Sequence, residues 1–121
     1  MNWFPFFLRR RNRPSGNPLG SVRFDDARIV FTRPDGATDY TSWSALTEVG
    51  VLTTDDGPLQ EDVFYMILSA TPGEGCAIPQ GADGTDQLLQ RLQQRPGFDH
   101  DTLIRAMGCT GNDRFVCWKR P

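Results

Sequence analysis

The chain has 121 residues, the length of one domain, and is long enough to bury a hydrophobic core without disulfide bonds. Hydrophobic residues make up 38% and charged residues 23%, which excludes a disordered chain, and no apolar run has the length needed to cross a bilayer. Residues 1–20 carry four arginines and no acid, whereas residues 21–121 hold nine basic and fifteen acidic residues, a charge of −6 that disfavours nucleic acid as a partner.

Residues 1–20 are predicted to be an aromatic and basic N-terminal segment with a linker, followed by a single α+β domain at residues 21–121. The basic residues come after the apolar ones, the reverse of a secretory signal. The candidate binding residues of this segment are Trp3, Phe4, Phe6, Phe7, Arg9, Arg10 and Arg11. They suit contact with the chain's own domain, with a partner protein or with an anionic membrane surface, and these three alternatives stay open.

Strand signals occupy the next part of the chain. Apolar residues alternate with polar ones before the turn signal Pro34-Asp35-Gly36, and the most apolar run, residues 63–68, is typical of a central strand. The predicted strands lie at residues 22–24, 29–31, 40–43, 46–52, 63–68, 76–78 and 115–118.

Two short helices are predicted late in the chain. Thr85 and Asp99 are expected to cap their N-termini, and Gly108 to end the second helix. The predicted apolar faces are Leu88, Leu89 and Leu92 in the first helix and Leu103, Ile104 and Met107 in the second. Strands followed by helices predict an α+β fold with a mostly antiparallel sheet of six to seven strands.

A resemblance to bacterial pleckstrin-homology-like domains is carried by residues 42–49, with the sequence SWSALTEV, and by the helix after Thr85. These residues resemble the third-to-fourth-strand region and the closing helix of such domains, and the resemblance covers residues 21–95. It implies a partial barrel and a binding scaffold rather than an enzyme. Members that bind phosphoinositides have a basic loop between the first two strands. This chain has Asp25 and Asp26 there, so lipid binding is not implied.

The later part of the chain is similar to a family of small proteobacterial proteins. The resemblance is carried by Pro96-Gly97-Phe98-Asp99, Ala106-Met107 and Phe115-Val116-Cys117-Trp118. It implies a bacterial protein and no particular activity. The near absence of lysine, with Lys119 the one example among thirteen basic residues, is also typical of a GC-rich bacterial genome.

The chain has one histidine, His100, and three cysteines, Cys76, Cys109 and Cys117. A histidine between Asp99 and Asp101 suits a general base and a cysteine suits a nucleophile, so a small thiol or histidine hydrolase is one alternative. The same two acids are typical of a helix N-terminus with His100 facing solvent. The spacing does not suggest zinc. The odd number of cysteines and the absence of a CxxC motif predict reduced thiols in a cytoplasmic protein. We predict no catalytic residue, no metal site and no cofactor.

Acidic residues are concentrated in the predicted turns. In an up-and-down meander alternate turns lie at the same end of the sheet, so the second and fourth turns are expected to share one end. The candidate acidic rim comprises Asp35, Asp55, Asp56, Glu61 and Asp62. It is predicted to steer a basic partner protein, as in an immunity or antitoxin-like protein. A solvated loop cluster and a calcium site are the alternatives.

The expected function is that of a non-enzymatic, cytoplasmic bacterial domain that binds another protein. A membrane-peripheral protein anchored by residues 1–13 and the small hydrolase are the alternatives. Aromatic residues at strand spacing are typical of a core, and we assign Phe64 and Trp118 to it. Trp43 stays open between the core and a ligand pocket.

Overall fold

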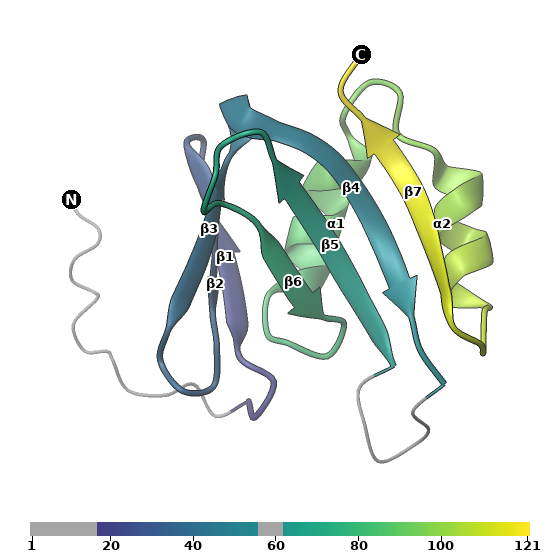
Figure 1. The fold of residues 1–121 in the computed structure, drawn as a ribbon, viewed down its shortest axis with the longest axis horizontal. Helices are drawn as coiled ribbons and strands as arrows, with labels where there is room; N and C mark the ends of the chain where they lie inside the picture. Colours follow the sequence, from purple (N-terminus) through teal and green to yellow (C-terminus); the bar gives the residue numbers. More distant parts are fainter. Residues whose placement is uncertain (1–16, 56–61) are drawn as a thin grey trace.

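The computed structural model of the chain describes residues 17–55 and 62–121. Figure 1 shows the arrangement of the strands and helices in these residues. The strands are β1 (Ser21–Phe24), β2 (Arg28–Thr32), β3 (Thr38–Ser42), β4 (Leu46–Thr53), β5 (Val63–Ser69), β6 (Cys76–Pro79) and β7 (Asp113–Lys119). The helices are α1 (Thr85–Gln93) and α2 (His100–Met107), and a short 3-10 turn at Trp43–Ala45 joins β3 to β4.

The strands form two antiparallel sheets, with the orders β1-β2-β3 and β6-β5-β4-β7. The predicted α+β fold, with seven mostly antiparallel strands and two late helices, is therefore confirmed. Within the described residues the strands do not close into a barrel. The two sheets approach each other beside β3, where the Gly75 N–H donates to the Tyr40 carbonyl at 3.0 Å. No helix in the described ranges is long and apolar enough to cross a membrane.

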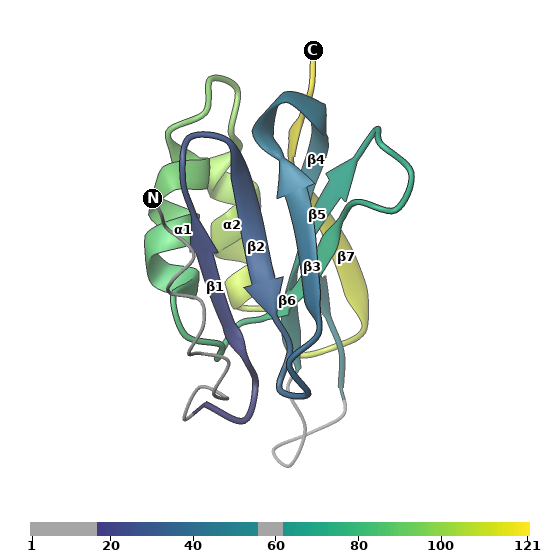
Figure 2. The same ribbon diagram turned by 90° about the vertical axis from the view of Figure 1, so that its left-hand side faces the viewer.

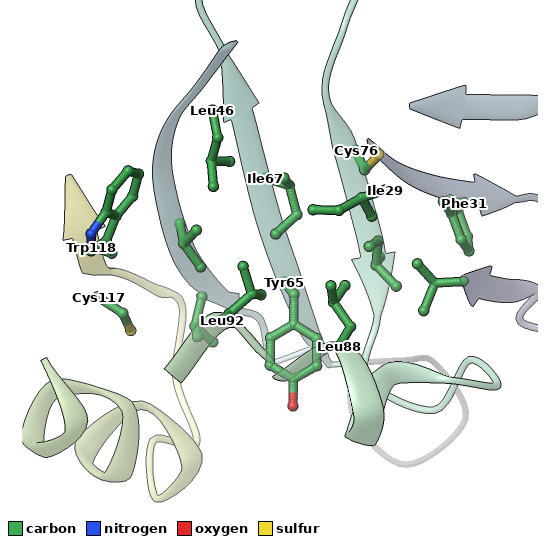
Figure 3. Close-up of a cluster of buried hydrophobic side chains, with 14 of the residues drawn as sticks. Ile29, Phe31, Leu46, Tyr65, Ile67, Cys76, Leu88, Leu92, Cys117 and Trp118 are labelled. Carbon is green, nitrogen blue, oxygen red and sulfur yellow. The ribbon is translucent and has the colours of Figure 1, made fainter. Parts of the chain in front are cut away.

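The core lies between the two sheets, and α1 closes it. In β2, Ile29 and Phe31 are buried while their neighbours face outward. This two-residue period is typical of a strand with one solvent-exposed face. Figure 3 shows Leu88 and Leu92 of α1 pointing into the same cluster as Tyr65 of β5. Each fully buried leucine contributes about 1.5–3 kcal/mol relative to an exposed one. One hydrophobic cluster thus joins both sheets to both helices.

The central strand β4 lies between β5 and β7, and Val49, Val51 and Thr53 are buried on its core side, whereas Glu48 and Leu52 on the other face are half-buried. Its pairing with β7 shifts register between Val49 and Gly50. A Cβ added at Gly50 would lie only 2.6 Å from the Phe115 carbonyl oxygen. The close approach of β7 at this irregularity therefore requires glycine.

The helix caps are partly as predicted. Asp99 caps α2, where its carboxylate accepts the Thr102 N–H at 3.0 Å. The prediction that Thr85 caps α1 is wrong. The cap is Gly84, with φ +87°, and it lies against the Val22 carbonyl, where a side chain has no room. Thr85 is instead the first helical residue, and its hydroxyl donates to the carbonyls of the preceding loop.

Three assignments of apolar residues to the core are wrong. Leu103 and Ala106 form the buried face of α2, together with Thr102, whereas Ile104 is 70% exposed and Met107 is 37% exposed. The register of α2 against β7 selects that face, and periodicity alone does not distinguish it from its neighbour. In β5 the alternation places Tyr65 in the core, so half-buried Phe64 faces away from it.

The molecule has two distinct ends in Figures 1 and 2. The upper end contains the β1–β2 turn, the β3–β4 connection, the α1–α2 loop and the end of β7. The lower end contains the β2–β3 turn, the end of β4, the start of β5 and the turn before β7. These two ends gather charged side chains of different kinds.

Candidate functional site

A groove of about 650 Å³ lies on the three-stranded sheet. It occupies the outer face of the sheet, because its lining residues Arg23, Val30 and Tyr40 alternate with buried residues of the core. The lining residues are Arg23, Phe24, Asp25, Ala27, Arg28, Val30, Thr38 and Tyr40. An antiparallel sheet commonly leaves one face in water, and here that face is hollowed.

A row of cross-strand neighbours forms the floor of the groove. Arg23 is paired with Val30, and Val30 in turn with Tyr40. Tyr40 is 43% exposed, and the guanidinium of Arg28 lies 5.5 Å from the centre of its ring. At an exposed site such a cation–π contact favours this arrangement of ring and charge by about 0.5–1 kcal/mol. The floor therefore combines an apolar strip with oriented positive charge.

Asp25, the acidic residue that lines the groove, belongs to the β1–β2 turn and not to the floor of the groove. The Asp25 carboxylate accepts the N–H groups of Arg28 at 3.0 Å and Ala27 at 2.8 Å. These two hydrogen bonds, the Arg28 one first, hold the pKa of Asp25 below its usual value, and the charges of Arg28 and Arg23 act in the same direction. Asp25 is thus an ionised turn residue, and no lining residue is a histidine or cysteine.

The structure describes three of the five residues of the predicted acidic rim. Asp35 lies in the β2–β3 turn, where its carboxylate accepts the Ala37 N–H at 2.9 Å. Asp55 and Asp62 lie where β4 ends and β5 begins, and both turns belong to the lower end. The other two, Asp56 and Glu61, lie outside the described residues.

The candidate N-terminal segment lies outside the described residues. This concerns Trp3, Phe4, Phe6, Phe7, Arg9, Arg10 and Arg11. The described chain begins with Asn17, whose side-chain amide donates to the Gly81 carbonyl at 2.8 Å and to the Asp83 carboxylate at 3.0 Å. These bonds tie the start of the described chain to the loop before α1.

The structure does not bring the histidine and the cysteines together. The ring Nδ1 of exposed His100 lies 3.3 Å from the Gln93 side-chain oxygen. Cys76 and Cys117 are buried, and burial raises the pKa of each thiol to about 11. Cys109 lies beside the Thr53 hydroxyl, at 3.5 Å. In the described ranges, no cluster of three or more His, Cys, Asp or Glu residues is suited to hold a metal ion.

Sequence reasoning missed the groove, although part of its signal was present. Val30 and Tyr40 alternate with buried residues and therefore had to face outward. Pairing across strands, which places Arg23 and Tyr40 on either side of Val30, is a property of the fold. A comparison with protein-family models, curated proteins and solved structures finds no match to this chain.

Proposed function

We propose that this protein is a non-enzymatic interaction domain that binds a segment of another protein in the groove of the three-stranded sheet. The observation that carries this proposal is exposed Tyr40, held by Arg28 on the floor of a hollow. Tyrosine and arginine are enriched among the residues that dominate protein–protein binding energy. A tyrosine that is already oriented loses little conformational entropy on binding.

The groove favours a partner segment with an apolar side chain next to a carboxylate. Val30 and the Tyr40 ring offer an apolar strip, and Arg28 supplies positive charge at its border. A guanidinium fork binds a carboxylate with two parallel hydrogen bonds. The carboxylate of Asp25 accepts the turn N–H groups through one oxygen, and it forms no ion pair with Arg28 in the described residues.

The placement of the reactive side chains favours binding over catalysis. A thiol nucleophile acts as the thiolate, and burial keeps Cys76 and Cys117 protonated near neutral pH. His100 lies beside Gln93, and no thiol is within hydrogen-bonding distance of it in the described residues. A cysteine–histidine pair needs such contact for activation.

Site-specific photo-crosslinking in the native cytosol tests the proposal. A photoreactive residue at Thr38, which lines the groove, is expected to capture a defined protein. The control is the same photoreactive residue at Gln87, an exposed position on α1, which is expected not to capture that protein. The captured protein is then purified and its affinity measured. Tyr40→Ala is expected to weaken binding by about thirtyfold, the size of a hot-spot effect, while Tyr40→Phe keeps most of it. Equal affinity of the Tyr40→Ala variant and the wild type contradicts the proposal.

A further inference from the structure

Three arginines gather around two tryptophans at the upper end of the molecule. The guanidinium of Arg91 lies 4.8 Å from the ring centre of Trp43. The guanidinium of Arg95 lies 5.7 Å from Trp43 and 4.4 Å from Trp118, so it sits between the two rings. Arg120 is the third member. We call these five residues the arginine–tryptophan cluster.

Arg120 is fixed by backbone carbonyls rather than by an acid. Its guanidinium donates to the carbonyls of Leu46 at 2.8 Å and Ser44 at 2.9 Å. Its charge lies close enough to Arg95 to act on it. Burial lowers the pKa of Arg95, and repulsion from Arg120 and Arg91 lowers it further. The cluster therefore concentrates positive charge at a cost in electrostatic energy.

The two rings are held rigidly. The indole N–H of Trp43 donates to the Asp25 carbonyl at 2.6 Å, and that of Trp118 donates to the Pro96 carbonyl at 3.0 Å. Both rings are buried. The Nε of Arg95 is also buried and has no hydrogen-bond partner in the structure. The rings thus fix the arginines before any ligand arrives, which lowers the entropic cost of binding.

Within the described residues no carboxylate pairs with these three arginines. The ion pairs found there are Arg33 with Asp39 and Arg114 with Glu48, both elsewhere. Two acids of the upper end, Asp25 and Glu74, are engaged with other groups, and Asp26 lies exposed in the β1–β2 turn. The Asp25 carboxylate accepts turn N–H groups, and Glu74 accepts the N–H and hydroxyl of Ser42 and the hydroxyl of Ser69. The positive charge lacks a counterion from the described part of the chain.

We infer that the arginine–tryptophan cluster is a receptor for the carboxylate groups of an acidic peptide segment from another protein. Planar guanidinium forks suit carboxylates, and the buried indole rings hold two of these forks in place. A long polyanion such as nucleic acid is disfavoured, because it would extend beyond the cluster over the rest of residues 21–121, which carry a charge of −6, whereas a short peptide contacts the cluster alone. The cluster shares no residue with the groove, so this inference goes beyond the proposed function and does not depend on it.

NMR spectroscopy of the full chain tests the inference directly. The probe is a blocked tetraglutamate peptide, and the matched control is the tetraglutamine peptide. The chain has three tryptophans, and substitution to phenylalanine assigns each indole N–H signal. Tetraglutamate is expected to shift the signals of Trp43 and Trp118 in a saturable way, and tetraglutamine to leave them in place. Movement of the Trp3 signal alone places the peptide at the N-terminal arginines and overturns the inference.

A matched pair of variants separates specific binding from general attraction. Arg91 and Arg105 each lie in the last turn of a helix, and only Arg91 belongs to the cluster. At low salt Arg91→Gln is expected to weaken tetraglutamate binding by about tenfold, whereas Arg105→Gln changes it by less than about twofold. Arg91→Lys, which keeps the charge without the fork, is expected to fall between them.

Three further results overturn the inference. These are the absence of indole shifts with tetraglutamate, equal weakening by Arg91→Gln and Arg105→Gln, and shifts with inorganic phosphate but not with the peptide. The last result assigns the cluster to a small oxyanion instead. Thermal unfolding of each variant checks that the fold is intact.

Discussion

At the lower end of the molecule the Asp35 carboxylate accepts an N–H of its own turn at 2.9 Å, and Arg33 pairs with Asp39 at 3.0 Å. At the upper end Arg91 and Arg95 lie on indole rings and have no carboxylate partner in the described residues. At the lower end, Asp35 and the Arg33–Asp39 pair are therefore engaged locally. At the upper end, the positive charge of the arginine–tryptophan cluster has no such local partner in the described residues.

The difference teaches which kind of site a sequence can reveal. A carboxylate that accepts an N–H two residues away, as Asp35 does, belongs to a turn signal that can be read from neighbouring residues. The upper-end cluster joins residue 43 to residues 91–95 and 118–120. Nothing in the spacing of these residues marks them as neighbours, and only the fold brings them together.

The largest effect is expected from removing a ring at the upper end. Trp118 is 5% exposed, donates to the Pro96 carbonyl and contacts the Arg95 guanidinium. Trp118→Ala is expected to lower the free energy of unfolding by about 3–5 kcal/mol, from the lost burial and the cavity. Asp35→Ala at the lower end is expected to cost about 1 kcal/mol or less. Urea unfolding measures both.

The milder variant Trp118→Phe serves as the control. It keeps an aromatic ring and removes the indole N–H, so its loss of stability is expected to be smaller than that of Trp118→Ala. If Trp118→Ala and Asp35→Ala cost the same, the upper end is not a rigid platform and the comparison fails.

Thiol reactivity is expected to distinguish the buried cysteines of the core from the half-buried cysteine in a turn. Cys76 and Cys117 are buried with pKa values raised to about 11, whereas Cys109 is half-buried in the turn before β7. At pH 8 a shift of two pKa units reduces the thiolate fraction about a hundredfold. Cys109 is therefore expected to react first with a thiol reagent in the native protein, and the other two far more slowly.

All three thiols are expected to react after unfolding without prior reduction, because the structure contains them as free cysteines. Cys109→Ser is expected to remove the fast phase and nothing else. A consistent loss of two reactive thiols in the unfolded protein would indicate a disulfide and count against reduced cysteines.

Acid is expected to destabilise the upper end through its hydrogen-bonded carboxylates. The N–H groups of Arg28 and Ala27 lower the pKa of Asp25, and the N–H of Ser42 lowers the pKa of Glu74. A lowered folded-state pKa adds stability above the unfolded value of about 4, and that stability is lost as the pH falls through the folded value. The free energy of unfolding is therefore expected to be level from neutral pH to about pH 5 and to fall below about pH 4.

Asp25→Asn tests the origin of that acid limb. It removes the titrating group, so the slope of stability against pH below about 4 is expected to become shallower. Asp25→Ser, whose hydroxyl accepts the turn N–H groups more weakly than the Asn amide oxygen, is expected to show the same shallower slope with a larger loss of stability at neutral pH. If the slope of stability against pH is unchanged in both variants, the loss of stability at low pH is due to other carboxylates.

Most of the fold was predictable from the sequence, and most of the site was not. The alternation around Ile29 and the cap at Asp99 depend on neighbouring residues and were predicted correctly. The buried face of α2 was not, because Ile104 and Ala106 are both apolar and tertiary packing chose between them. The groove around Tyr40 depends on which strands pair, and that register is a long-range property.

The smallest effect on stability, and the most specific one on association, is expected from the acidic rim. Exposed Asp55 lies at the lower end, and Asp56 follows it in the sequence. The double charge reversal Asp55→Lys and Asp56→Lys is expected to change the free energy of unfolding by less than about 0.5 kcal/mol, as exposed substitutions do. It is expected to slow association with a basic probe, oligolysine, several-fold at low salt, because like charges repel each other as the two molecules meet.

The matched control is Asp26→Lys. Asp26 is an exposed acid in the β1–β2 turn at the upper end, and its reversal is expected to slow association less per charge reversed. Stopped-flow measurements at several salt concentrations give the comparison. Association rates that are equal in the wild type and the reversed variant, with no salt dependence, would leave the rim only a role in solubility.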